Sequence, residues 1–458
     1  MNLQEYFASL QGKTVAVIGF GVSNRPLVER LLEAHIALTI CDKKSREALG
    51  DVVAELEAKG AIWSLGETYL DNLHQDVIFR TPGMRPDVPA LKNAKDSTIT
   101  SEMEVFFSVC PCPILAVTGS DGKTTTTTLI AELLKAAGHT VHVGGNIGHP
   151  LLCEADAMKP TDFAVLELSS FQLMTMPHSP HTAVMTNLAP NHLDYHTDMD
   201  EYVEAKANLI AHQTADNVAI FNADNEITMD LSHTAKAQVN LFSRQRAVEN
   251  GVYLQDGTVF VAEHGEVTPV LQASDIRIPG LHNVENYMAA ICAVWGLVSP
   301  EMIQSVAKNF GGVAHRIEWV RTLDGVRYYN DSIASSPSRT MAGLHAFTQK
   351  VNLIAGGYDK QIPFTELGAE IVTHVGHLIL CGHTAEKIEQ AVLSAPNYEV
   401  GKPVIYEATD LAQAVALARS VSKEGDVVTL SPACASFDQF PNFAARGDKF
   451  RALVQNLE

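Results

Sequence analysis

Hydrophobic positions along this chain follow two patterns that alternate from one end to the other. Short apolar runs rich in Val, Ile and Leu are followed by longer stretches whose apolar positions recur at helical spacing. This alternation is typical of strand–helix–strand units built around parallel sheets. We therefore predict an α/β fold throughout the chain.

Three predicted strands run into a glycine-rich turn, in residues 13–21, 113–125 and 351–360. Ligands bind at the carboxyl ends of strands in open parallel sheets, so each turn marks a unit with a site of its own. A chain of 458 residues also exceeds what a single core usually holds. We predict three domains, at residues 1–98, 99–310 and 311–458. Within the second domain, residues 251–267 alternate around Asp256-Gly257 and predict a hairpin.

The composition is that of an acidic globular protein, with 46% hydrophobic and 19% charged residues. Its net charge of −20 disfavours nucleic acid as a partner, because that binding depends on clustered Lys and Arg. No basic-then-apolar leader and no run of about 18 apolar residues is visible, so we expect a cytoplasmic protein without membrane insertion. The seven cysteines are scattered, and Cys110-x-Cys112 lacks the C-x-x-C spacing, so we expect reduced core thiols.

A candidate phosphate-binding loop follows the predicted strand 113–118. It comprises Gly119, Ser120, Asp121, Gly122, Lys123, Thr124 and Thr125, and a helical pattern ending at Gly138 follows it. Backbone N–H groups at a helix N-terminus would bind phosphate oxygens, Lys123 would pair with the β- and γ-phosphates, and Thr124 would hold Mg²⁺. Val117 replaces the first glycine of the standard Walker pattern, so a purely structural glycine turn is the alternative.

Two further residues at predicted strand ends are candidate metal ligands. Glu167 ends one buried strand, and His192 follows the next, so both are expected to face the phosphate loop. A carboxylate substrate can approach the γ-phosphate of ATP only when Mg²⁺ neutralises the like charges. The alternative to a metal-ligand role is an ordinary strand-end carboxylate for Glu167 and an interior histidine for His192. Lys206 lies on a helix predicted to begin near Asp198, and its residue type and spacing alone favour a surface lysine.

The turn at residues 19–24, G-F-G-V-S-N, resembles a dinucleotide-binding fingerprint. It follows a strand, and Asp42 closes the next strand at the expected distance. Asn24 stands where a third glycine would let the helix pack closely on the sheet. A nicotinamide-dependent dehydrogenase is therefore one alternative, and glycines that serve the turn's shape alone are another.

Further segments accompany these in a fixed order along the chain. They are G-G-N-I-G (144–148), E-L-S-S-F-Q-L (167–173), T-N-L-x-x-x-H-L-D (186–194), N-A-D (222–224), G-L-H-N-V-E-N (280–286), H-R (315–316), N-D-S (330–332) and S-P-A-C-A-S-F-D-Q-F-x-x-F-x-x-R-G (431–447). With T-G-S-D-G-K-T-T, the series resembles the Mur ligases across essentially the whole chain. The resemblance implies a Rossmann-like UDP-binding N-terminal domain, a P-loop ATPase-like central domain and a Rossmann-like C-terminal domain.

Two of these segments, E-L-S-S-F-Q-L and S-P-A-C-A-S-x-D-x-F, resemble the member of the family that adds D-glutamate. That resemblance implies UDP-N-acetylmuramoyl-L-alanine and D-glutamate as substrates, ATP and two Mg²⁺ ions as cofactors, and an acyl-phosphate intermediate in the making of a cell-wall precursor. A monomer is expected. The resemblance further implies that Lys206 is carbamylated, which would turn a cation into an anionic metal ligand.

The resemblance assigns roles residue by residue. Nucleotide contacts would come from Lys123, Thr124, Asn283, Asn286, Arg316 and Asp331, and metal ligation from Thr124, Glu167, His192 and Lys206. The UDP part of the substrate would contact Val22, Ser23, Asp42, Lys43, Thr81 and Gly83, and its muramoyl-alanine part would lie near Asn146 and Ser169. D-Glutamate would be bound by Ser335, Lys360, Ser436 and Phe443.

The chain departs from the family pattern at Ile333, where many members carry a lysine two residues after the Asp of N-D-S. The D-glutamate pocket is therefore expected to use a different set of contacts. The nearest alternative function is another amide ligase of the superfamily, such as a folylpolyglutamate synthetase, which shares this variant of the phosphate loop. A non-catalytic nucleotide-binding regulator is the remaining alternative.

Overall fold

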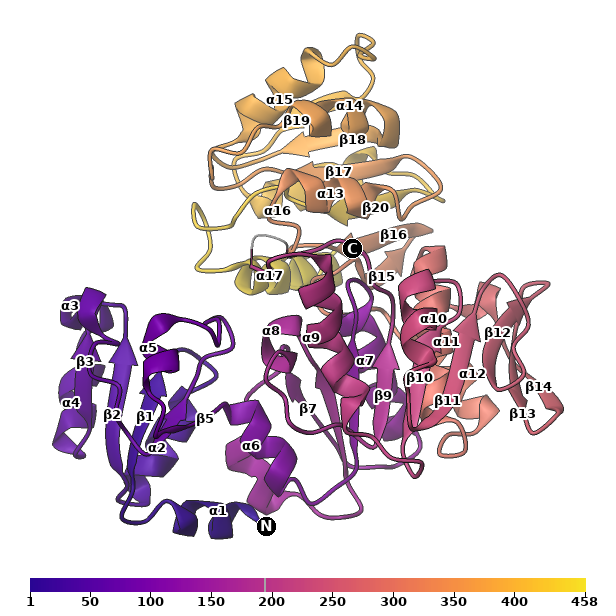
Figure 1. The fold of residues 1–458 in the computed structure, drawn as a ribbon. Coiled ribbons are helices and arrows are strands. Elements are labelled where there is room, and N and C mark those ends of the chain that lie inside the picture. Colours follow the sequence, from indigo (N-terminus) through magenta and orange to yellow (C-terminus); the bar gives the residue numbers. More distant parts are fainter. Residues whose placement is uncertain (193–194) are drawn as a thin grey trace. The chain divides into compact units, whose positions relative to one another are not determined.

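The structure is a computed structural model that describes residues 1–192 and 195–458. It divides into two compact units, which are unit one (Met1–Ser274 with Val284–Val306) and unit two (Asp275–Asn283 with Ala307–Glu458). The described residues form three sheets, two in unit one and one in unit two (Figure 1). The predicted α/β class is confirmed, whereas the domain boundaries at 98 and 310 stay predictions. Within the described part of the chain, no helix has the length and apolar character needed to cross a bilayer.

The first sheet of unit one consists of five parallel strands. They are β1 (Thr14–Ile18), β2 (Ala37–Asp42), β3 (Ile62–Leu65), β4 (Val77–Phe79) and β5 (Thr98–Thr100), in the order β3-β2-β1-β4-β5. Its helices are α1 (Leu3–Ser9), α2 (Arg25–Glu33), α3 (Arg46–Leu49), α4 (Val52–Ala58), α5 (Pro89–Asn93) and the 3₁₀ turn η1 (Gly66–Thr68). In β1, Val15 and Val17 enter one core while Ala16 and Ile18 enter another. Both faces of this sheet are therefore covered, which is why the strand is apolar at successive positions.

The second sheet of unit one has nine strands. They are β6 (Ile114–Thr118), β7 (Val141–Gly145), β8 (Phe163–Glu167), β9 (Thr182–Met185), β10 (Val218–Asn222), β11 (Gln238–Ser243), β12 (Gly251–Gln255), β13 (Thr258–Glu263) and β14 (Glu266–Gln272). The order is β14-β13-β12-β11-β10-β9-β6-β8-β7, so β6 lies between β9 and β8 and runs parallel to both. The carboxyl ends of β6, β8 and β9 therefore meet at one edge of the sheet, as the sequence predicted.

Several helices and 3₁₀ turns accompany this sheet, and the predicted end of one helix and start of another are confirmed. They are α6 (Glu102–Val109), α7 (Lys123–Ala136), η2 (Leu152–Ala157), α8 (Ser170–Leu173), α9 (Met199–Ala211), α10 (Glu226–Ser232), η3 (Ala273–Asp275), α11 (Leu281–Val294) and α12 (Pro300–Asn309). Just beyond α7, Gly138 takes a left-handed φ of 86° and ends the helix as expected. Asp198 caps α9 by accepting a hydrogen bond from the Glu201 N–H at 2.8 Å.

The predicted hairpin at residues 251–267 is confirmed. Strands β12 and β13 pair antiparallel around a two-residue turn in which Asp256 and Gly257 have φ values of 49° and 78°. Positive φ at both central positions is the geometry that an Asp-Gly turn favours between twisted strands. Strand β14 then extends the antiparallel part at the far edge of the sheet.

Unit two contains a six-stranded sheet. Its strands are β15 (Glu318–Leu323), β16 (Val326–Asn330), β17 (Val351–Ala355), β18 (Val375–Leu380), β19 (Val404–Glu407) and β20 (Val427–Leu430), in the order β15-β16-β20-β17-β18-β19. Its helices are α13 (Pro337–Leu344), α14 (Thr365–His374), α15 (Ala385–Leu393), α16 (Leu411–Val421) and α17 (Phe443–Gln455). Leu353 packs into one core and its neighbour Ile354 into the other, so helices cover both faces of this sheet as well.

Candidate functional site

The predicted phosphate loop links β6 to α7. Gly119 and Gly122 have φ values of 150° and 80°, which side chains with a Cβ rarely adopt. A Cβ on Gly119 would also lie 1.9 Å from the hydroxyl oxygen of Thr186. Val117 is a buried residue inside β6, so the loop begins later than the Walker pattern requires and Gly119 is its first glycine. The turn leaves the N-terminus of α7 available for phosphate oxygens.

Hydrogen bonds to the segment after β9 and to helix α9 hold the loop in place. The hydroxyl of Ser120 contacts both the carbonyl of Ala189 and the phenol oxygen of Tyr202, each at 2.9 Å. The N–H of Asp121 donates to the Asn187 side chain at 3.0 Å, while the Thr186 hydroxyl donates to the Asp121 carbonyl at 2.5 Å. The loop is thus fixed before any ligand binds, which lowers the entropic cost of binding.

Two lysine side chains meet at this loop. The ammonium of Lys123 donates to the carbonyls of Gly119 and Ser120, both at 2.9 Å. The ammonium of Lys206 donates to the same Gly119 carbonyl at 3.0 Å and to the hydroxyl of Thr118 at 3.1 Å. The structure therefore places two nitrogen groups within reach of one carbonyl, at the position predicted for phosphate.

Lys206 is buried, which corrects the expectation of a surface lysine that the sequence alone favoured. Only 2% of its surface is exposed, because α9 turns this face toward β6 and the loop. Burial lowers the pKa of Lys206 to about 7, with a smaller contribution from the positive charge of Lys123 and an opposing one from Glu167. A substantial fraction of this amine is therefore neutral near pH 7.

Glu167 is the last residue of β8, and its carboxylate is only half satisfied. One oxygen accepts a hydrogen bond from the side-chain amide of Asn146 at 2.6 Å. The other oxygen, Oε2, is buried and has no hydrogen-bond partner among the residues that the structure describes. A buried carboxylate oxygen without a partner is costly unless a cation or a donor compensates it. Glu167 beside the phosphate loop therefore fits a divalent cation, and its role as a metal ligand stays a prediction.

His192 lies outside this hydrogen-bonded group. It is exposed, has a φ of 54°, and its ring contacts that of Phe171 edge-on at a centroid distance of 5.1 Å. The alternative of an interior histidine is therefore wrong, while the metal-ligand role stays a prediction. Leu193 and Asp194, which complete the T-N-L-x-x-x-H-L-D motif, lie outside the described residues.

Asn286, a predicted nucleotide residue of unit one, lies against the loop. A Cβ on Gly122 would approach the Asn286 side-chain oxygen to 2.4 Å, and the Thr126 hydroxyl donates to that oxygen at 3.2 Å. Thr124 is half-buried in the first turn of α7, and Thr125 is buried behind it. In unit two, the side chain of Asn283 donates to the Pro279 carbonyl at 2.6 Å.

A cavity of about 230 Å³ within unit one collects several of the predicted substrate residues. Val22, Ser23 and Asn146 line it, together with Gln172 and His149. The hydroxyl of Ser169 lies next to this cavity, because it bonds to the Gln172 side chain at 2.9 Å in the capping box that starts α8. One proposed muramoyl-alanine residue, Asn146, and two proposed UDP residues therefore line one cavity, and the other muramoyl-alanine residue, Ser169, lies beside it.

The remaining UDP residues surround the turn after β1. One carboxylate oxygen of Asp42 accepts from the Phe20 N–H at 2.7 Å, so this residue fixes the turn instead of projecting from it. A Cβ on Gly19 would lie 3.3 Å from the Thr81 side chain, which places the second loop against the first. Lys43 and Gly83 are exposed.

Asn24 explains the missing third glycine of the fingerprint. It is buried at the start of α2, and its side-chain amide donates to the carbonyls of Ile18 and Gly19 at 3.1 and 3.0 Å. The side chain thus holds the carboxyl end of β1 where a glycine would allow the backbone to approach. This contact defines a turn that differs from the dinucleotide-binding one.

Glu102 is a buried carboxyl in the wall of the same cavity and gives this region a pH dependence. Burial raises the pKa of Glu102 to about 7, although it accepts a hydrogen bond from the Leu152 N–H at 2.8 Å. Because the folded-state pKa lies above the unfolded value of 4.5, the folded state loses stability as the pH rises from 4.5 to 7.

Glu102→Gln should therefore raise the melting temperature at pH 8 and leave it nearly unchanged at pH 5. The pKa difference corresponds to roughly 3 kcal/mol at pH 8, as an upper bound. Calorimetry at both pH values checks this, with the exposed Glu204→Gln on α9 as the control. Equal shifts at the two pH values would contradict the assignment.

In unit two, Arg446 joins two of the segments that carry predicted D-glutamate residues. Its buried guanidinium donates to the Ser332 hydroxyl at 3.0 Å, to the Ser332 carbonyl at 2.9 Å and to the Cys434 carbonyl at 3.0 Å. Ser335 follows the first segment and Ser436 belongs to the second. The Ser436 hydroxyl is buried and unpartnered among the described residues, which suits a polar ligand.

The other predicted residues of unit two differ in exposure. Asp331 is buried and accepts from the Ser431 hydroxyl at 2.7 Å, and burial raises its pKa to about 7. Arg316, Lys360 and Phe443 are exposed, so their side chains are available to ligands. Their roles stay predictions.

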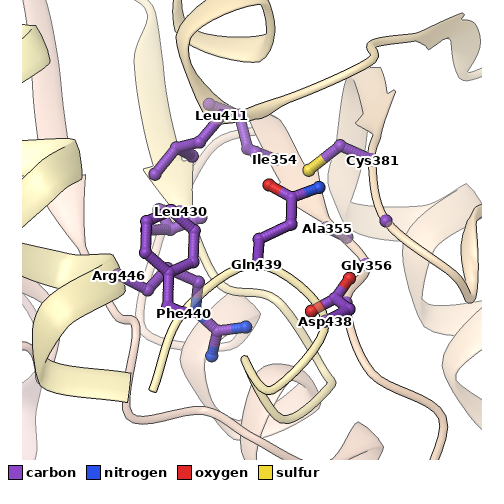
Figure 2. Close-up of a pocket in the computed structure, with 12 residues that line it drawn as sticks. Ile354, Ala355, Gly356, Cys381, Leu411, Leu430, Asp438, Gln439, Phe440 and Arg446 are labelled. Atoms are coloured by element: carbon purple, nitrogen blue, oxygen red, sulfur yellow. The ribbon is translucent and has the colours of Figure 1, made fainter. Parts of the chain in front are cut away.

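The strand order of this sheet reverses between β17 and β20. A small pocket lies beside this point, at the carboxyl ends of β17, β18 and β20 (Figure 2). Gly356, Gly382, Asp438 and Arg446 line it. Ligands gather at such switch points in parallel sheets. None of the four predicted D-glutamate residues lines this pocket, although Ser436 lies in the same segment as Asp438.

Several residues of these sites escaped the sequence analysis. Thr118, Tyr202 and Gln172 contact Lys206, Ser120 and Ser169 respectively. The S-x-x-Q spacing of Ser169 and Gln172 is a capping-box pattern that could have identified Gln172. Thr118 and Tyr202 carry no such pattern, because their contacts depend on how α9 packs.

Comparisons with known proteins agree with this arrangement. Residues 117–294 match the Mur ligase middle domain, and residues 315–434 match the Mur ligase glutamate ligase domain. Over 459 residues, covering 100% of the chain and 99% of the relative, it is 50% identical to UDP-N-acetylmuramoylalanine–D-glutamate ligase of Clostridium novyi (strain NT). An equally named protein of Acetivibrio thermocellus is 48% identical over 463 residues, with the same two coverages of 100% and 99%. UDP-N-acetylmuramate-alanine ligase from Thermotoga maritima, a solved structure 17% identical, shares the fold with a TM-score of 0.56 over 97% of this chain and 99% of that one.

Proposed function

Because this chain belongs to the Mur ligase family, we propose that it joins D-glutamate to UDP-N-acetylmuramoyl-L-alanine through an amide bond, with cleavage of ATP. The observation that carries the proposal is the group at the phosphate loop. Lys123 and Lys206 both bond to the Gly119 carbonyl, next to strand β8 with its half-satisfied Glu167 carboxylate. The substrates are inferred from the full-length relatives that are named for this reaction.

The reaction has two steps. The L-alanyl carboxylate attacks the γ-phosphorus of ATP, and the bond to ADP breaks, which gives an acyl phosphate. The amine of D-glutamate then attacks the acyl carbon, loses a proton, and displaces inorganic phosphate as the amide forms. Backbone N–H groups at the start of α7 and the Lys123 ammonium stabilise the negative charge on the transferred phosphoryl group.

Mur ligases use Mg²⁺ with ATP, and the residues present fit such an ion. Glu167, Thr124, His192 and a modified Lys206 would hold two ions, with the unpartnered oxygen of Glu167 as the support for the first. When bound, Mg²⁺ supplies the positive charge that lets a carboxylate approach a phosphate. Of these residues, Glu167 and Lys206 are buried and therefore fixed in place by packing.

We also propose that Lys206 is carbamylated. The neutral amine attacks CO₂ and releases one proton, and the product is an anionic carbamate. Its burial in a site with a neighbouring lysine favours the neutral amine that this reaction requires. The change from a cation to an anion would also give Lys123 an opposite charge to pair with.

The substrate contacts complete the proposal. The cavity with Val22, Ser23 and Asn146 takes the UDP-muramoyl part, and the loops with Asp42, Lys43, Thr81 and Gly83 flank it. Ser335, Lys360, Ser436 and Phe443 bind D-glutamate, where the exposed ammonium of Lys360 supplies the charge opposite a carboxylate. All seven cysteines are free, which is consistent with a cytoplasmic protein, and a monomer is the proposed form.

Phosphate release with UDP-N-acetylmuramoyl-L-alanine, ATP and Mg²⁺ tests this function, with D-glutamate, L-glutamate, D-alanine, L-lysine and diaminopimelate compared as amines. We expect turnover with D-glutamate at least about 100-fold faster than with the others, because a misplaced carboxylate leaves buried polar groups unpaired. Turnover with a different amine would assign the chain to another branch of the family. Consumption of NADH in place of ATP would support the dehydrogenase alternative instead.

A further inference from the structure

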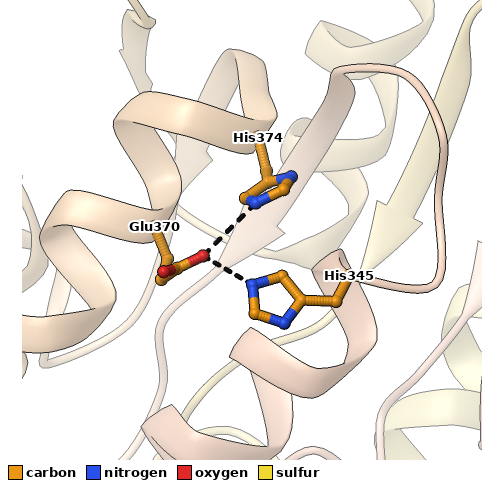
Figure 3. Close-up of side chains that lie close together, drawn as sticks. All are labelled: His345, Glu370 and His374. Atoms are coloured by element: carbon orange, nitrogen blue, oxygen red, sulfur yellow. Dashed lines mark hydrogen bonds and ion pairs between the residues drawn. The ribbon is translucent and has the colours of Figure 1, made fainter.

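Two histidines and one glutamate gather on the surface of unit two, away from the phosphate loop in sequence. The Nε2 atom of His345 lies 2.7 Å from Oε2 of Glu370, and the Nε2 atom of His374 lies 3.3 Å from the same oxygen. The two imidazole rings have centroids 4.9 Å apart. Figure 3 shows both rings directed at this carboxylate from two different helices.

The local fold explains why these side chains meet. His345 is the C-cap residue of α13, while Glu370 and His374 stand one turn apart near the end of α14, so both point from the same face. Helices α13 and α14 pack against each other in the core on one side of the sheet. Neither side chain of α14 needs a large rearrangement to approach His345.

The chemistry of the group suits a borderline metal ion better than Mg²⁺. Two imidazole nitrogens and one carboxylate oxygen are donors that zinc prefers, whereas Mg²⁺ prefers oxygen alone. The three donor atoms lie within 4.8 Å of one another. Donors about 2.0 Å from a tetrahedral zinc lie roughly 3.3 Å apart, so a small rotation of the exposed His345 would close the site. The partial exposure leaves a fourth position for water.

We propose that His345, Glu370 and His374 bind one divalent transition-metal ion, zinc above all, at a site separate from the proposed Mg²⁺ centre. The ion would replace the hydrogen bonds between these groups and link α13 to α14. Because the two helices contribute ligands that are far apart in the unfolded chain, binding would stabilise the folded state of unit two. Serine residues 335 and 336 immediately precede α13, so the linked helix pair also supports one end of the proposed D-glutamate loop.

The test uses the full chain without an affinity tag, treated with a chelator and then dialysed free of it. Isothermal titration with ZnCl₂ in excess Mg²⁺ should show one zinc ion bound, and zinc at 100 times its dissociation constant should raise the melting temperature. His345→Ala and His374→Ala should each weaken zinc binding at least about 10-fold without lowering the metal-free melting temperature. The matched control is His233→Ala, which removes another exposed histidine from a helix C-cap, in unit one.

Glu370→Gln distinguishes two roles of this side chain, metal ligand and hydrogen-bond acceptor. Glutamine keeps an oxygen that accepts hydrogen bonds but loses the negative charge. We expect this variant to bind zinc more weakly than the wild type while its metal-free stability stays within a few degrees. The proposal is overturned if the wild type binds no zinc in excess Mg²⁺, or if the three variants bind it as tightly as the wild type does.

Discussion

Lys206→Met is expected to reduce phosphate release in the complete reaction by about 10³-fold, because it removes the group proposed to become the anionic metal ligand. Methionine is unbranched and fills the buried space between α9 and β6, so the fold should survive. The reaction rate with all three substrates measures the effect. Glu204→Ala, an exposed residue on the same helix, is the control and should leave the rate unchanged.

Carbamylation is tested separately from the role of the side chain. The wild-type protein in ¹³C-labelled bicarbonate should show one carbamate carbon resonance that Lys206→Met lacks, and removal of CO₂ should lower the wild-type rate. Normal turnover of Lys206→Met would contradict any role of Lys206 in the reaction. If Lys206→Met loses turnover but the wild type shows no carbamate resonance, the lysine acts as an unmodified amine.

Lys123→Ala is expected to lower the same rate by about 10³-fold or more, since its ammonium lies at the start of α7, where the proposed mechanism develops charge on the transferred phosphoryl group. Binding of the UDP substrate, measured by calorimetry without ATP, should remain because that cavity uses other residues. Lys135→Ala is the matched control, since this lysine is exposed at the opposite end of the same helix and pairs only with Glu132 among the interactions described.

The two measurements together distinguish the role of Lys123 from a general loss of folding. Reduced turnover with intact binding of the UDP substrate supports a role at the phosphate. Parallel loss of both would mean that the hydrogen bonds from Lys123 to the loop carbonyls mainly maintain the loop's shape.

The sequence was most informative where a pattern reports a local requirement. The alternation of short apolar runs with helical patterns predicted strand–helix–strand units around parallel sheets, and the Asp256-Gly257 pair predicted its hairpin because only a few residues accept positive φ. Glycines 119 and 122 predicted the loop for the same reason. The position of Glu167 next to this loop could then be predicted, since the carboxyl ends of parallel strands lie at the same edge of a sheet.

Residues whose role depends on packing between distant elements could not be predicted in this way. Helical spacing shows that Lys206 lies on a helix but not which face of that helix is buried, and lysine alone favours the surface. The side chain of Asn24 takes the place of a glycine through two hydrogen bonds to carbonyls, which no spacing rule anticipates. His345 and His374 meet only because α13 packs on α14.

The strand order β9-β6-β8-β7 has a consequence for how this enzyme is made. Neither neighbour of β6 is the strand that follows it in sequence, so the loop, Glu167 and Lys206 meet only after distant segments have paired. Contacts of large sequence separation form late, because the entropy of closing long loops must be lost before they stabilise the chain. Helices such as α7 and α9 can form early in synthesis, yet the proposed phosphate and metal site is a late product of folding.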